Sequence, residues 1–174
     1  SLISIPIIWQ NLLEYQKYRI LVFLNPELDT LGKGYQIMQS KIAIGSGGMF
    51  GKGYLTGSQS RLDFLPEKHT DFVYTLISEE MGFIGSMSVL ILYFAINTIL
   101  IREFLKEENF TNKILIFGVS FLIFLYVIFN VGMVSGLIPV VGAPLPFISN
   151  GGTSLITIFI GLGIIQSIRV SRNV

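Results

Sequence analysis

The residue types that could carry out chemistry are concentrated between residues 45 and 80 of this 174-residue chain. Glycines, lysines, carboxylates and the single histidine gather in GSGGMFGKGYLTGSQSRLDFLPEKHTDFVYTLISEE, whereas the flanking sequence is mostly apolar. Asp71 could act as a general base, because a helix N-terminus keeps a carboxylate ionised and partial burial raises its basicity. Pro66 disfavours helix before it and Thr70 is a good N-cap, so we predict that Asp71 lies at the start of a hydrophobic helix. An ordinary acid at a helix start is the alternative.

The glycines could bind an anion, since consecutive backbone amides form a nest for phosphate oxygens. A P-loop is excluded, because Ser46 stands where its first glycine belongs and Gly53 stands where Ser or Thr must follow the lysine. The candidate anion-binding backbone is Ser46, Gly47 and Gly48. Tight turns in a packed loop explain the glycines equally well.

Composition assigns the chain to a membrane. Apolar residues make up 51% of it and its mean hydropathy is +0.67, which is too high for an ordinary soluble domain. A net charge of +1 without a basic stripe gives no basis for nucleic-acid binding. The absence of cysteine excludes a disulfide framework and a thiolate metal site.

We therefore expect an all-α fold, a polytopic membrane helix bundle with a long structured extracytoplasmic loop. The uncharged run 81–101 is long enough to span a bilayer, and Pro and Gly repeatedly break helix between 132 and 152. Basic residues in the short loop and the tail place both in the cytoplasm by the positive-inside rule. The expected segments are the end of a truncated membrane helix (1–13), the extracytoplasmic loop with short amphipathic helices (14–70), membrane helices (71–101, 114–131, 153–168), a cytoplasmic hairpin (102–113), a Pro/Gly-rich extracytoplasmic broken segment (132–152) and a cytoplasmic tail (169–174).

Residues 14–24 allow two interpretations, a helix lying at the membrane surface or the frayed end of a preceding span. The uncharged start of the chain is too short to cross a bilayer, so we expect it to begin inside a helix of a longer protein.

Two long motifs, in this order, resemble one known family. The first comprises GSGG (45–48), GKG (51–53), FLPEKHTDF (64–72) and SEEMG (78–82), and the second is GMVSGLIPVVGAPLPFISNGG (132–152). Both resemble the SEDS family of RodA, FtsW and SpoVE proteins, with Ser149-Asn150 where Ser-Tyr is more usual. Lys41 in QSKIAIGSGG, the GKG and VVGAPLP are more similar to the RodA branch. The chain resembles roughly the C-terminal half of such a protein.

The resemblance implies a peptidoglycan glycosyltransferase that polymerises lipid II during cell-wall elongation and cell-shape maintenance. It also implies that Asp71 is the catalytic residue, a class B penicillin-binding protein is the partner, and the site lies on the extracytoplasmic face of the bacterial cytoplasmic membrane. A lipid II flippase and a non-catalytic membrane scaffold of the division or elongation machinery are the alternatives, and we expect the fragment alone to be inactive.

Further candidate residues surround Asp71. Lys41, Lys52, Arg61 and Lys68 could together neutralise a departing pyrophosphate, although each alone is more often a surface charge. His69 either orients the loop or contacts substrate, and Thr70 is placed beside it. Glu79 or Glu80 serves the cavity or forms a structural ion pair. Asp63 and Asp71 could hold a divalent cation, Mg²⁺ or Mn²⁺, whereas His69 with Asp71 alone is too small a ligand set for structural zinc.

Overall fold

The structure is a computed structural model that describes residues 10–29, 32–57 and 70–172. Two short helices, α2 (Glu14–Leu24) and α3 (Lys33–Ser46), flank the 3₁₀ turn η1 (Pro26–Leu28), and three long helices follow. These are α5 (Val73–Lys106), α6 (Phe110–Val134) and α7 (Gly152–Arg172). All three are long and apolar enough to cross a membrane. The prediction of an all-helical chain is confirmed for the part that the structure describes, and this part has three candidate membrane spans.

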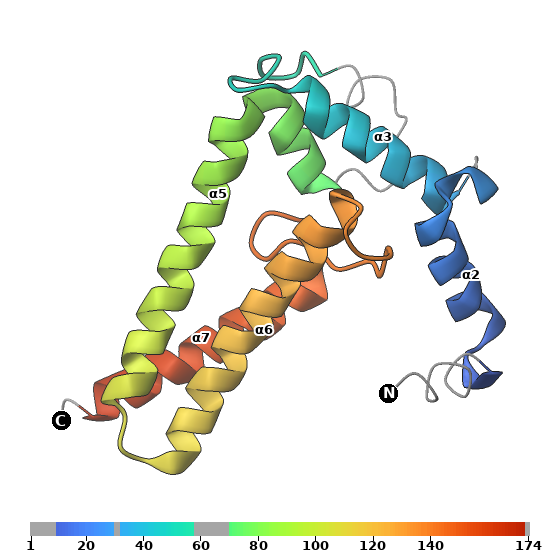
Figure 1. The fold of residues 1–174 in the computed structure, drawn as a ribbon. Coiled ribbons are helices and arrows are strands. Elements are labelled where there is room, and N and C mark those ends of the chain that lie inside the picture. The colour runs from blue at the N-terminus through green and yellow to red at the C-terminus, as the bar shows by residue number, and fades with distance from the viewer. Residues whose placement is uncertain (1–9, 30–31, 58–69, 173–174) are drawn as a thin grey trace.

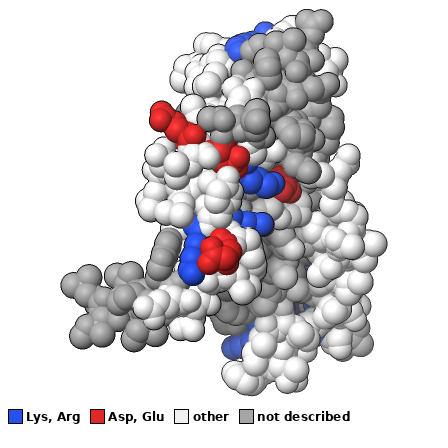
Figure 2. All heavy atoms as spheres, turned by 90° about the vertical axis from the view of Figure 1, so that its right-hand side faces the viewer, with Lys and Arg blue, Asp and Glu red and all other residues white. Residues whose placement is uncertain are grey.

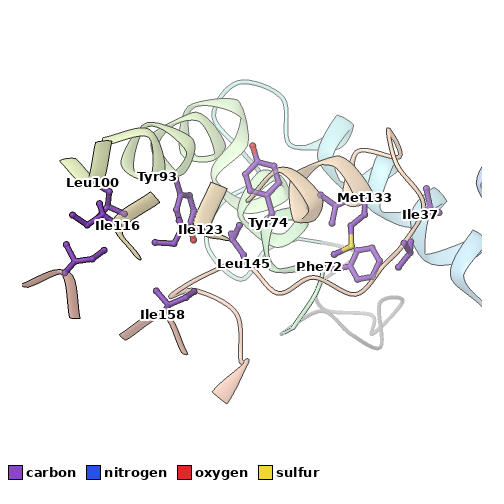
Figure 3. Close-up of a cluster of buried hydrophobic side chains, with 13 residues drawn as sticks. Ile37, Phe72, Tyr74, Tyr93, Leu100, Ile116, Ile123, Met133, Leu145 and Ile158 are labelled. Atoms are coloured by element: carbon purple, nitrogen blue, oxygen red, sulfur yellow. The ribbon is translucent and has the colours of Figure 1, made fainter. Parts of the chain in front are cut away.

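The long helices form the body of the molecule, and α3 lies across one end of it (Figure 1). α6 packs mainly against α5, α7 packs against α6, and α3 contacts the start of α5. The buried core runs between these helices, and Figure 3 shows Phe72 and Met133 together within it. Large apolar side chains such as Phe94, Phe117 and Phe159 stay exposed on the outer faces, as a lipid environment requires.

The short helix α2 has the bounds that the sequence predicts. It ends at Leu24 because the residue before a proline disfavours helix. Its one buried residue is Val22, and it exposes Tyr15 and Tyr18. Charged side chains of both signs are interspersed on the face of the molecule that carries this helix (Figure 2), and Lys17 pairs with Glu14 there at 3.4 Å. A helix at the membrane surface and the end of a preceding span both stay predictions for α2.

The helix after Asp71 differs from the prediction in two ways. It begins at Val73 with Phe72 as its N-cap residue, so Thr70 is not the cap, and no side chain caps it. It is also broken at Gly82, whose φ of 67° and ψ of −161° are not helical. The first turns up to Met81 therefore form a separate short helix, and the sharp bend is visible below the loop that follows α3 (Figure 1).

The loop after α3 satisfies the backbone on both sides of this break. The amides of Lys52 and Gly53 donate to the carbonyls of Glu79 and Glu80, at 3.0 Å each. On the other side, the amides of Phe83 and Ile84 donate to loop carbonyls at 2.8 and 3.2 Å. The loop thus replaces the hydrogen bonds that the interruption removes from the helix.

The charged hairpin is shorter than predicted, since only residues 107–109 connect α5 to α6. Asn109 caps α6 by accepting from the amide of Thr111 at 2.9 Å. Helix α5 continues through its charged end because Arg172 of α7 pairs with Glu103 at 2.6 Å. A charge with a partner from another helix does not need to lie in a loop.

The broken segment is irregular as predicted, although α6 extends through Val134, so residues 135–151 are non-helical. The protein covers parts of it: Leu145 is buried, its amide donates to Ser149 Oγ at 2.8 Å, and Tyr93 of α5 donates its hydroxyl hydrogen to the Pro146 carbonyl. Irregular backbone at membrane depth is stable when protein covers it in this way.

Candidate functional site

Asp71 lies where three parts of the chain meet. It is partly buried in the turn that precedes α5. Its backbone carbonyl accepts a hydrogen bond from the side-chain amide of Asn130 on α6, at 2.9 Å. The same amide donates to the carbonyl of Ala143 in the broken segment, at 2.7 Å. Through Asn130, the backbone of Asp71 in the first motif region is connected to the backbone of Ala143 in the second.

The carboxylate of Asp71 rests against Gly142. A Cβ built on this glycine would lie 3.2 Å from Asp71 Oδ2, and the glycine has a φ of 75°. A side chain at this position would therefore be strained and would crowd the carboxylate. The absence of a side chain at Gly142 therefore leaves room for the Asp71 carboxylate.

Buried hydroxyl groups anchor α3 beside the first turn of α5. Ser40 Oγ donates to the Val134 carbonyl and lies 2.7 Å from Thr75 Oγ1. Thr75, Ser78 and Glu79 are all buried, whereas Glu80 is only partly buried. This agrees with the predicted helix face, on which Glu80 points away from the other three.

The glycine-rich loop after α3 packs closely against the broken part of α5 and uses several of its polar groups in hydrogen bonds within the protein. Cβ atoms on Gly47 and Gly51 would collide with the carbonyl oxygens of Ser78 and Glu80. The Gly47 amide donates to the end of α3, the Gly51 amide donates to Gly47, and Ser46 Oγ donates to Ala43 at 2.8 Å. Close approach to the broken helix explains these glycines, so the packing interpretation is better supported than the anion nest. Substrate binding by Ser46, Gly47 and Gly48 stays a prediction.

Lys52 forms an ion pair with Glu79, with Nζ 2.8 Å from Oε1. This confirms the structural ion-pair alternative for Glu79. Glu80 contributes its backbone carbonyl to the Gly53 amide. Lys41 is exposed on α3, and its side chain lies over Gly136, where a Cβ would collide with it.

Several predicted residues lie outside the described ranges, namely Arg61, Asp63, Lys68 and His69. Thr70 is described and lies in the turn beside Asp71. Within residues 10–29, 32–57 and 70–172, no group of three or more His, Cys, Asp or Glu side chains could hold a metal ion. Asp63 lies outside these ranges, so binding of Mg²⁺ or Mn²⁺ by Asp63 and Asp71 stays a prediction.

A mostly apolar cavity of about 350 Å³, with a few hydroxyl groups in its lining, opens between the end of α3, both parts of α5 and the end of α6. Ser78 and Ser86 line it, and Ser86 Oγ donates to Ser78 Oγ at 2.8 Å. Thr75, on the same buried face as Ser78, separates this cavity from the Asp71 turn by about one helical turn.

Sequence reasoning missed Asn130 and Gly142. Asn130 carried a usable signal, because an amide inside the apolar run 114–131 is costly unless it is bonded. Gly142 carried none beyond its place in the broken segment, since its role depends on which side chain approaches it.

Three membrane-length helices pack around the non-helical segment and the turn that carries Asp71. This arrangement defines a multi-pass membrane protein with its candidate site at one end of the bundle. The chain belongs to the FtsW/RodA/SpoVE family, described as "Cell cycle protein", whose sequence model matches residues 1–174. The resemblance carried by the two motifs is thereby confirmed.

Relatives with descriptive names support this assignment. The chain is 46% identical over 170 residues to "Peptidoglycan glycosyltransferase MrdB" of Escherichia coli strain K12, covering 97% of this chain and 46% of that protein. It is 44% identical over 160 residues to "Peptidoglycan glycosyltransferase RodA" of Treponema pallidum, covering 91% and 36%. It is 41% identical over 159 residues to "Stage V sporulation protein E" of Bacillus subtilis, covering 91% and 43%. The chain thus spans less than half the length of these relatives.

The fold is also similar to a solved structure described as "Structural coordination of polymerization and crosslinking by a peptidoglycan synthase complex". The TM-score is 0.69 at 34% identity, and the match covers 93% of this chain and 44% of the other.

Proposed function

We propose that this chain supplies the catalytic base of a RodA-type peptidoglycan glycosyltransferase that polymerises lipid II during cell-wall elongation. The observation that carries the proposal is the placement of the Asp71 carboxylate, between the start of α5 and Gly142 of the broken segment. Two relatives named as peptidoglycan glycosyltransferases match nearly the whole chain, which supports the reaction class.

The reaction joins two sugars. The 4-hydroxyl of the GlcNAc of one lipid II attacks the anomeric carbon of a glycan chain that is linked to lipid pyrophosphate. A bond forms between this oxygen and the anomeric carbon, the bond from that carbon to the pyrophosphate oxygen breaks, and undecaprenyl pyrophosphate leaves. Asp71 accepts the hydroxyl proton, which makes the oxygen a better nucleophile as the bond forms.

The departing pyrophosphate requires positive charge nearby. Lys41 and Lys52 are the described candidates and both are exposed, but Lys52 also pairs with Glu79. A divalent cation, Mg²⁺ or Mn²⁺, belongs to the proposal on chemical grounds, because it would neutralise the leaving group.

The proposal places the site on the extracytoplasmic face of the cytoplasmic membrane and includes a class B penicillin-binding protein as partner. The solved complex with the similar fold coordinates polymerization and crosslinking, which supports a partner of this kind. The short basic hairpin and tail support the orientation.

A lipid II transporter is the second candidate, and the break in α5 at Gly82 favours it specifically. Transporters bind substrate where membrane helices are interrupted. In this chain, however, loop amides and carbonyls occupy both ends of the break, which leaves fewer backbone groups for a ligand.

The test is Asp71→Asn in the full-length protein with its partner, assayed for glycan polymerisation in detergent with lipid II and Mg²⁺. The substitution keeps the size of the side chain and removes the base, so the rate should fall by about a hundredfold or more. Glu108→Gln is the matched control, because this exposed acid lies in the loop at the other end of α5. Normal polymerisation by Asp71→Asn would refute the base, and an inactive unmodified complex would favour transport.

A further inference from the structure

Asn130 occupies a demanding position near the end of α6. Its side chain is fully buried at 0% exposure. Its amide nitrogen donates to two carbonyl oxygens at once, those of Asp71 and Ala143. Since both partners are acceptors, the NH₂ group and not the oxygen must face them, and an asparagine supplies two such donors from one atom.

The two acceptors belong to two backbone segments that are close to the Asp71 carboxylate. One is the carbonyl of Asp71 itself, in a turn that no side-chain cap stabilises at the start of α5. The other is the carbonyl of Ala143, directly after Gly142, where a built Cβ would lie 3.2 Å from Asp71 Oδ2. A single amide therefore bonds both the backbone that carries the carboxylate and the backbone next to it.

Stability alone does not account for this residue. Asn130 Oδ1 is buried and accepts no hydrogen bond from the described part of the chain. Such a group costs about 1–3 kcal/mol, which offsets much of what the two donated hydrogen bonds contribute to stability, at about 0.5–1.5 kcal/mol each. A residue that keeps this penalty inside an apolar helix is expected to serve function.

We infer that Asn130 is a positioning residue for the catalytic base, which holds Asp71 and the Gly142–Ala143 backbone in one geometry through its amide. This inference rests on the proposed function. Asn130 does not itself need to contact substrate, so it should affect the chemical step through Asp71 and leave lipid II binding almost unchanged.

The experiment uses Asn130→Ala and Asn130→Asp in the full-length protein with its partner. The first removes both donors, and the second keeps the volume while turning the donors into an acceptor. Misplacing a reacting group by about 1 Å can cost a hundredfold, so kcat should fall tenfold to a hundredfold with KM for lipid II within about twofold. Asn97→Ala is the matched control, because Asn97 also joins α5 to α6, by accepting from Ser120 Oγ at 3.0 Å, and should keep kcat within about twofold.

A double variant separates positioning from a general structural role. If Asn130 acts through Asp71, adding Asn130→Ala to Asp71→Asn should lower the residual rate no further. An equal loss in both backgrounds, or failure of both Asn130 variants to accumulate in the membrane, would overturn the inference. Full activity of Asn130→Ala would overturn it too, while absence of polymerisation by the unmodified complex would refute the proposed function instead.

Discussion

The role of a single residue in this chain depends on the groups that contact it, and Glu79 is one example. It is fully buried at 0% exposure, next to the broken end of the first part of α5. Its partner Lys52 keeps 30% of its side chain exposed. If the ion pair were broken, water could therefore solvate the Lys52 ammonium group more easily than the Glu79 carboxylate.

This asymmetry predicts unequal effects of two neutral substitutions. Lys52→Met takes the cation from a buried carboxylate, whereas Glu79→Gln leaves a lysine that water can still reach. We expect Lys52→Met to lower stability by about 1–3 kcal/mol and Glu79→Gln to lower it less. Thermal unfolding of the purified full-length protein in detergent measures both.

The same pair tests whether Lys52 also serves the substrate. A lysine that contacts pyrophosphate would raise KM or lower kcat when it is replaced, even in protein of unchanged stability. Equal unfolding temperatures for Lys52→Met and the unmodified protein, with reduced polymerisation, would contradict the structural role and support the prediction that Lys52 binds substrate.

Residue roles were predictable where the reason is local or carried by a motif. The ion pair of Glu79 followed from a carboxylate in an apolar helix, which needs a cation. Asn130 and Gly142 were not predicted, because their roles arise from contacts with Asp71 that span about sixty and seventy residues of sequence.

At the scale of helices and loops, the loop that follows α3 and the break in α5 depend on each other. The break in α5 needs Gly82 in a conformation that L-residues rarely adopt, and a Cβ there would collide with the Gly51 amide nitrogen. Gly51, with a φ of 79°, is in turn pressed against the Glu80 carbonyl. The loop and the break are thus one structural unit.

Substitution of either glycine by alanine should disrupt the packing of the loop against the break in α5. Gly82→Ala and Gly51→Ala each add a Cβ where backbone atoms already lie, so we expect marked loss of stability and of polymerisation. Gly45→Ala is the matched control: it lies on α3 with no atom within 4 Å of its built Cβ, and alanine favours helix by up to about 1 kcal/mol.

Limited proteolysis and thermal unfolding in detergent read out this comparison. If Gly82→Ala were as stable as Gly45→Ala, α5 could run straight through residue 82 and the loop would not be required to complete it.

Element type was well predicted by hydrophobic length, and element breaks were not. Uncharged runs predict spans because backbone groups in lipid must be satisfied within a helix. A glycine inside such a run is compatible with a continuous helix, so the sequence around Gly82 does not reveal the break. The deciding hydrogen bonds come from Gly48 to Gly53, about thirty residues away.

The whole molecule has two polar ends separated by apolar helices. One end contains Asp71, the broken segment and the glycine loop. At the other end, Arg172 pairs with Glu103 and lies 3.7 Å from Glu107 Oε2, which ties the end of α7 to the α5–α6 connection. A membrane that covers the apolar middle would therefore place these two ends on opposite sides.

This arrangement predicts opposite labelling of two introduced cysteines. The chain contains no cysteine of its own, so Tyr54→Cys and Glu108→Cys can be labelled individually in a full-length protein whose other cysteines are removed. Tyr54 is 81% exposed in the glycine loop, and Glu108 is exposed in the connection between α5 and α6.

An impermeant maleimide applied to intact cells should label Tyr54→Cys, and it should label Glu108→Cys only after the membrane is opened. Phe94→Cys, in the apolar middle of α5, should resist the reagent in both conditions. Labelling of Glu108→Cys on intact cells would invert the orientation, and it would place Asp71 on the cytoplasmic side, where a polymerase of extracytoplasmic glycan could not use it.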